Sequence, residues 1–124
     1  MEYVCVDTDV LIDFLKGKTY AVEFIREHAG HIATTFVNLF ELYHGARDES
    51  EILVIDRLQQ ILFLLNLSVL AVKLAGSIGA GLQKRGNTLD FRDIFIGSIA
   101  LVHNCALKTN NKRHFVHIQG LQII

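Results

Sequence analysis

Acidic side chains placed next to apolar, strand-like segments are the residues of this sequence best suited to chemistry. Asp7 and Asp9 directly follow the β-favouring run at residues 3–6. Glu41 and Asp93 fall in the first turns of two later helical patterns. Carboxylates that gather in one place repel one another unless a cation is present, and hard oxygen ligands with room for water favour Mg²⁺ or Mn²⁺. These acids therefore predict a divalent-cation site.

Each acid also has a purely structural interpretation. Asp9 could cap the first helix, and Asp93 could interact with the positive end of its own helix dipole. Glu41 stands between apolar neighbours rather than on a polar helix face. Asp7 is the hardest to explain structurally, because a carboxylate at the end of a central apolar strand is costly to bury without a function.

The elements that must position these acids alternate between strands and helices. We expect strands at residues 3–6, 31–34, 63–67, 105–109 and 121–124. We expect helices at residues 9–16, 19–28, 36–46, 50–62, 68–85 and 91–103, with a polar turn or short helix at 110–114. This alternation predicts an α/β fold, a three-layer α/β/α sandwich on a central, mostly parallel sheet. Because ligands of such sheets bind beyond the carboxyl ends of the strands, the acids should meet at one sheet edge.

Composition limits the remaining possibilities. A chain of 124 residues, with 51% hydrophobic residues, predicts one domain spanning 1–124. A net charge of −1 gives no overall field toward nucleic acid, so any such contact needs a local basic patch. Cys5 and Cys105 lie in apolar runs and are expected to be reduced and buried. No secretory leader or membrane-spanning stretch is recognised, which predicts a cytoplasmic protein with no membrane partner.

Four segments appear in a characteristic order along the chain. They are VDTDVLID at 6–13, TTFVNLFELYHGA at 34–46, DFRDIFIGSIA at 90–100 and TNNKRHF at 109–115. In this order and spacing they resemble the motifs of PIN-domain ribonucleases, and most of all the VapC-type toxins of toxin–antitoxin modules. The resemblance covers nearly the whole chain and implies the PIN-like form of the α/β/α fold.

The resemblance also implies roles for particular residues. Asp7, Glu41 and Asp93 match the metal-binding carboxylates of the family, and Thr8 matches its hydroxyl beside the first acid.

Two positions depart from the commonest family pattern. Asp9 replaces a frequent asparagine, and Asn111 stands at the fourth acidic position. Since an amide is a weaker magnesium ligand than a carboxylate, Asn111 is expected to orient water or metal, with Asp9 restoring negative charge. Thr109, which opens the last segment, is expected to support the site together with these residues.

Basic residues flank the acids in sequence. Those expected to hold RNA phosphates are Lys84, Arg85, Arg92, Lys112 and Arg113. Lys84 and Arg85 would equally well complement a helix C-terminus. The six histidines form no convincing zinc pattern and are interpreted as surface residues.

The sequence thus predicts a Mg²⁺- or Mn²⁺-dependent endoribonuclease, the toxin of a type II toxin–antitoxin system, in which the cation lowers the pKa of the attacking water. By resemblance the cut leaves a 5′-phosphate and a 3′-hydroxyl, and the expected partners are RNA, a second copy of the chain and a cognate antitoxin. One alternative is a non-catalytic PIN-like module that binds RNA or protein.

A second alternative is an aspartyl-nucleophile phosphatase, suggested by the Asp-x-Asp pattern at residues 7–9. Such a phosphatase would require threonine or valine at Leu11, a late lysine and an acidic pair.

Overall fold

Four short parallel strands form the sheet in the computed structural model, which describes residues 2–124. They are β1 (Val4–Val6), β2 (Ile32–Thr34), β3 (Phe63–Leu64) and β4 (Ala106–Lys108), in the order β3-β2-β1-β4. In the centre, Val4 of β1 is in register with Ile32 on one side and Ala106 on the other. All pairings are parallel, so the carboxyl ends of the strands share one edge, as predicted.

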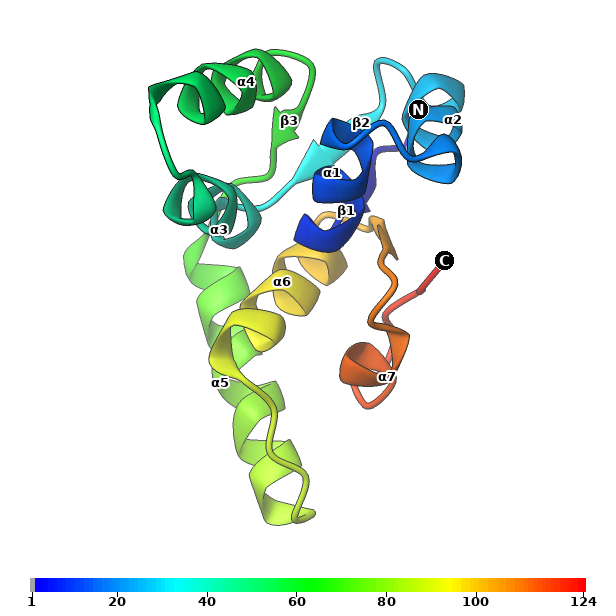
Figure 1. The fold of residues 1–124 in the computed structure, drawn as a ribbon. Helices are drawn as coiled ribbons and strands as arrows, with labels where there is room; N and C mark the ends of the chain where they lie inside the picture. The colour runs from blue at the N-terminus through cyan, green and yellow to red at the C-terminus, as the bar shows by residue number, and fades with distance from the viewer. Residues whose placement is uncertain (1) are drawn as a thin grey trace.

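Helices cover both faces of this sheet (Figure 1). They are α1 (Thr8–Leu15), α2 (Thr19–Glu27), α3 (Phe36–Gly45), α4 (Glu49–Gln59), α5 (Val69–Lys84), α6 (Phe91–Val102) and α7 (Lys112–Phe115). Alternate residues of a strand point to opposite faces. Accordingly, Val6 belongs to the buried cluster with α1, α2 and α4, whereas Cys5 belongs to the cluster with α5 and α6. The predicted three-layer α/β/α fold is confirmed.

Side-chain caps fix where several helices begin. Thr35 accepts a hydrogen bond from the backbone of Asn38, Ser68 caps α5, and Asp90 caps α6. Short polar side chains satisfy the unpaired N–H groups of a first turn. The helices α3 and α6 begin as predicted, whereas α5 begins at Val69, one residue after its expected start. Asp48 caps α4, which therefore begins at Glu49 instead of the expected residue 50.

Most elements match their predicted ranges to within one residue at each end, and three are shorter by more than this. After Gln59, residues 60–62 form tight turns instead of continuing α4, and β3 keeps only two of the five expected residues. The expected strand at 121–124 is reduced to one parallel bridge between Ile123 and Leu107. Apolar runs do not predict how many residues engage in the sheet ladder, which depends on neighbouring strands, and Phe63 and Leu64 of β3 remain exposed.

The cysteines and the membrane-spanning potential of the helices can also be compared with the sequence analysis. Cys5 and Cys105 are free and buried, as predicted. Of the helices in the described part of the chain, none combines the length and apolar character needed to cross a bilayer.

Candidate active site

Asp7 lies where β1 ends and α1 begins, and three elements hold its carboxylate in place. Its Oδ1 accepts hydrogen bonds from the backbone N–H of Thr8 (2.8 Å) and from Nδ2 of Asn38 (2.9 Å). Its Oδ2 accepts one from the hydroxyl of Thr109 (2.7 Å). Asp7 is only 6% exposed and is itself the N-cap of α1, so the interpretation of Asp9 as that cap is wrong.

Asn38 connects Asp7 to α3 and was not identified from the sequence. It is fully buried, and its Nδ2 donates both to Asp7 and to the hydroxyl of Thr8 (3.0 Å). Its Oδ1 accepts the hydroxyl of Thr35 (2.7 Å), which fixes the orientation of the amide. A sequence signal did exist, because Asn38 interrupts an apolar helical run three residues before Glu41 and therefore shares its face.

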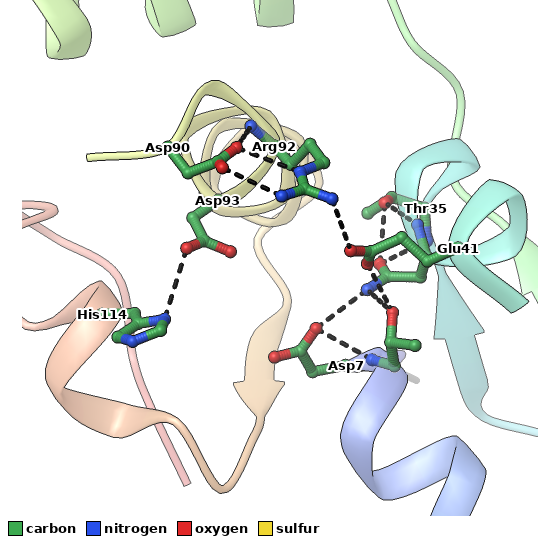
Figure 2. A network of polar contacts seen from close by, with 9 residues as sticks. Asp7, Thr35, Glu41, Asp90, Arg92, Asp93 and His114 are labelled. Carbon is green, nitrogen blue, oxygen red and sulfur yellow. Dashed lines mark hydrogen bonds and ion pairs between the residues drawn. The ribbon is translucent and has the colours of Figure 1, made fainter. Parts of the chain in front are cut away.

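Glu41 projects from α3 toward α1 and α6. The hydroxyl of Thr8 donates to Glu41 Oε1 (2.7 Å), and Arg92 Nη1 lies 3.7 Å from Glu41 Oε2. Arg92 is also paired with Asp90, whose Oδ2 is 3.0 Å from Arg92 Nη2. Figure 2 shows the guanidinium between these two acids. Arg92, predicted to contact RNA, is therefore held by carboxylates in this structure.

Asp93 enters the site from the first turn of α6. Its Oδ2 lies 3.4 Å from Nδ1 of His114, which comes from α7 (Figure 2). His114 is exposed, as expected of a surface histidine, but its contact with a site acid had no sequence signal.

A cavity of about 370 Å³ brings the predicted acids together. We call it the acidic cavity, and it is lined by Asp7, Thr8, Asp9, Ile12, Glu41, Asp90, Arg92, Asp93, Asn111 and His114. Every predicted metal-binding acid thus lies in one place, together with Thr8, Asp9 and Asn111.

The loop between β4 and α7 closes one side of the acidic cavity. The backbone N–H of Asn110 donates to Oδ2 of Asp9 (2.9 Å), and that of Asn111 donates to the hydroxyl of Thr109 (3.0 Å). Thr109 is buried behind Asp7 and does not line the cavity. Thr109 supports the site indirectly, because its hydroxyl donates a hydrogen bond to Asp7.

The remaining predicted basic residues lie outside the acidic cavity. Lys112 and Arg113 are exposed on α7, and Arg113 lines a neighbouring cavity. Lys84 and Arg85 end α5, at the tip that projects away from the sheet in Figure 1. Their placement supports the helix-terminus interpretation more than contact with a phosphate at the acids.

Burial and like charge raise the pKa of three acids of the cavity, Asp7, Asp9 and Asp93. Burial is the largest cause that raises the pKa of Asp7, and Glu41 raises it further, against the hydrogen bonds from Thr109, Thr8 and Asn38. Burial also raises the pKa of Asp93, where His114 opposes the shift and the surrounding acids add to it. The pKa of Asp9 is raised by burial and by the charge of Asp7. The cluster therefore carries more negative charge than its surroundings favour.

The chemistry of these side chains fits a hard divalent cation. Carboxylate, hydroxyl and amide oxygens are the ligands that Mg²⁺ and Mn²⁺ prefer, and all face one cavity. Within residues 2–124, however, no three acidic, histidine or cysteine side chains approach closely enough to enclose an ion. Arg92 and His114 instead lie beside Glu41 and Asp93, so a cation would share these two acids with them.

The fold and the site together define an α/β protein with an acidic site at the carboxyl edge of a parallel sheet. The family model described as PIN domain matches residues 4–121, and the chain belongs to this family. Ribonuclease VapC3 of Methanocaldococcus jannaschii is 33% identical over 94 residues, which are 76% of this chain and 94% of that protein. Ribonuclease VapC1 of the same organism is 27% identical over 122 residues, 97% of this chain and 85% of that protein.

Solved structures share the fold. The DNA-bound VapBC of Salmonella typhimurium contains a chain that matches with a TM-score of 0.91 at 23% identity, covering 100% of this chain and 98% of that one. VapBC2 from Rickettsia felis, bound to a promoter DNA fragment, matches with a TM-score of 0.90, also at 23% identity and with the same coverage. The chain is thus homologous to VapC proteins and has their fold.

Proposed function

We propose that the protein is a Mg²⁺- or Mn²⁺-dependent endoribonuclease that hydrolyses RNA phosphodiester bonds. The observation that carries this proposal is the meeting of Asp7, Glu41 and Asp93 in one cavity at the carboxyl edge of the sheet. Two relatives named as ribonucleases, at 27% and 33% identity, support RNA as the substrate.

The three acids would hold the cation, and the surrounding residues keep two of them in place. A bound divalent cation supplies a water that is a stronger nucleophile at neutral pH and stabilises negative charge on phosphate. Asn38 and Thr109 orient the two oxygens of Asp7, and the Thr8 hydroxyl orients Glu41. Such fixed geometry is required because small misplacements of reacting groups slow a reaction strongly.

Arg92 is the basic residue best placed for the scissile phosphate. Its guanidinium already reaches the rim of the acidic cavity, where Asp90 and Glu41 hold it. A phosphate can replace these carboxylates, because the planar guanidinium binds both groups through paired hydrogen bonds. In the same proposal, Lys112 and Arg113 contact the RNA backbone on the α7 side.

The proposed partner that controls this activity is an antitoxin. A largely apolar cavity of about 380 Å³ lies between α1, α3 and α4, and Glu41 borders it as well as the acidic cavity. A partner segment could place apolar side chains in the first cavity and a basic side chain among the acids. The solved VapBC complexes with the same fold support such a partner.

A homodimer is also proposed, because large apolar side chains remain exposed. Val69 is 76% exposed, Leu70 64% and Phe40 58%. Large exposed apolar side chains of this kind are suited to an interface with a second copy of the chain. Light scattering of the purified chain at micromolar concentration should give the mass of a dimer, and a stable monomer would contradict this part of the proposal.

Cleavage assays with matched variants test the proposed activity. Asp7→Asn, Glu41→Gln and Asp93→Asn should each reduce Mg²⁺-dependent cleavage of single-stranded RNA by about a hundredfold or more, since each removes a charge that holds the cation. Asp56→Asn is the matched control, because Asp56 accepts a hydrogen bond from Tyr43 outside the acidic cavity. Circular dichroism should show unchanged folding in all four variants. Cleavage by the three site variants at the wild-type rate would refute the site.

The alternative of a non-catalytic RNA- or protein-binding module also has one supporting observation. Arg92 pairs with Glu41, which neutralises part of the acidic charge without metal, and His114 contacts Asp93. Cleavage assays distinguish this module from a nuclease, since a binding module would not cut RNA with either Mg²⁺ or Mn²⁺.

The phosphatase alternative has less support. Both oxygens of Asp7 accept hydrogen bonds, and Asp7 is buried, whereas an aspartyl nucleophile needs a free oxygen facing the substrate. Failure to trap a phosphorylated Asp7 would exclude it.

A further inference from the structure

A second polar cavity lies beside the acidic cavity. We call it the α5–α7 cavity; its volume is about 440 Å³, and it is lined by Leu82, Gly86, Asn87, Thr88, Leu89, Arg113, His114 and His117. From this cavity we infer a subsite that binds one nucleotide of the RNA next to the phosphate that is cut. The inference rests on the proposed function, and it assigns to the α5–α7 cavity a ligand that neither the acids nor the family match specify.

The two cavities are joined by one side chain. His114 lines both of them, and its Nδ1 is 3.4 Å from Asp93 at the acidic end. A strand whose phosphate lies among the acids therefore passes over His114 into the α5–α7 cavity. Its volume falls within the range of about 300–1,000 Å³ that suits small ligands.

The charge of the α5–α7 cavity is opposite to that of its neighbour. No acidic residue lines it, and Arg113 stands at its wall. Within residues 2–124 the Arg113 guanidinium forms no ion pair within 4.0 Å, whereas Arg92 is paired with both Asp90 and Glu41. An unpaired arginine beside a site for RNA is suited to a backbone phosphate.

The other lining residues are suited to a base. His114 and His117 provide ring faces for stacking and the half-buried Leu89 provides apolar surface, while Asn87 and Thr88 provide uncharged hydrogen-bonding groups. Gly86, with φ of +75°, ends α5 and turns the chain so that residues 87–89 run beside α7. Bases of single-stranded RNA are recognised by just this combination of stacking surface and polar contacts at their edges. The cavity is thus equipped for both parts of a nucleotide.

Comparing Arg113→Gln with a control variant distinguishes RNA binding in this subsite from general electrostatic attraction of RNA to the protein. On a long single-stranded RNA we expect about a tenfold higher KM with kcat within about twofold, as for the loss of one charged contact. The slope of log affinity against log salt should fall by about 0.7, the value for one phosphate contact on a single strand. The matched control is Arg57→Gln, which removes the same charge from α4, outside both cavities.

Trimmed RNAs locate the bound nucleotide. Two substrates are shortened to the cut site, one from the 5′ side and one from the 3′ side. The effect of Arg113→Gln should disappear on one of them and persist on the other, because only one side occupies the α5–α7 cavity. On the long RNA, Asn87→Ala should change the relative rates for different bases at that nucleotide. An effect that persists on both trimmed RNAs, or that equals the effect of Arg57→Gln, overturns the subsite.

A binding measurement tests the subsite even if the protein has no cleavage activity. If the wild-type protein cuts no RNA, fluorescence anisotropy with labelled single-stranded RNA replaces the kinetic assay. Weaker binding and a lower salt slope for Arg113→Gln alone would then support the subsite while the nuclease proposal fails. Identical binding by wild type, Arg113→Gln and Arg57→Gln would overturn the subsite.

Discussion

Thr109 and Asp7 lie 102 positions apart in sequence, yet the Thr109 hydroxyl donates to Asp7 Oδ2 over 2.7 Å. The same hydroxyl oxygen accepts the backbone N–H of Asn111 over 3.0 Å. Thr109 is therefore a buried link between the first acid of the site and the loop that closes it.

Removing this hydroxyl should destabilise the protein at neutral pH. Thr109→Val keeps the side-chain shape but leaves an oxygen of the buried Asp7 without its donor, and we expect a loss of about 1.5–3 kcal/mol in the free energy of unfolding. Thr109→Ser, which keeps the hydroxyl, is the control and should lose less. Urea denaturation at pH 7.5 measures both, and equal stability of Thr109→Val and wild type would contradict the importance of this link.

Asp7→Asn should show how the buried charge affects stability as pH changes. The folded pKa of Asp7 is raised above its unfolded value near 3.9, so its favourable contribution is present at low pH and is lost as pH rises through the folded pKa. Asparagine does not titrate. In chelator, the melting temperature of Asp7→Asn minus that of wild type should therefore grow from pH 4 to neutral pH, as scanning calorimetry can measure. A difference that shrinks over this range would mean that the pKa of Asp7 is lowered.

Magnesium should stabilise the wild-type protein through the same carboxylates. A cation that binds only the folded protein, at tenfold excess over its Kd, adds about 1.4 kcal/mol, which is a few degrees in melting temperature for a domain of this size. Asp7→Asn and Asp93→Asn should lose this response, and Asp56→Asn should keep it. Thermal melts with chelator and with millimolar Mg²⁺ or Mn²⁺ give the answer. An undiminished shift in Asp7→Asn would place the metal elsewhere.

Tyr20 should affect activity although it lies outside the acidic cavity. Its hydroxyl donates to Asp13 and accepts Nδ2 of Asn110 over 2.6 Å, while the backbone of Asn110 holds Asp9. Tyr20→Phe frees this loop, so we expect a severalfold lower kcat and a weaker stabilisation by magnesium. Tyr43→Phe is a matched control, because Tyr43 donates to Asp56 on α4, away from the site. If both variants have equal kcat, the loop is positioned without Tyr20.

Much of this site could be predicted because its acids are tied to recognisable strand ends and helix starts. Asp7 follows an apolar strand, Asp93 follows the cap Asp90, and a parallel sheet necessarily brings such positions to one edge. These inferences need only local pattern and topology.

Other residues of the site could not be recognised from local pattern. His114 meets Asp93 only because α7 packs beside the start of α6, and Arg92 reaches Glu41 only because α3 and α6 are adjacent. The length of β3 likewise depends on its pairing with β2. Such features arise from tertiary packing, as does the position of Lys84 and Arg85, which are close to Arg92 in sequence but end α5 and do not line the acidic cavity.

The central position of β1 has a consequence for the timing of synthesis. A ribosome produces Asp7 and Glu41 early, but Thr109 and the loop at Asn111 become available only after β4 has been made and has paired with β1. Contacts between such distant residues form slowly, because a long loop must close before they are gained. A growing chain therefore holds Asp7 and Glu41 in an incomplete site until β4 and the loop at Asn111 have emerged.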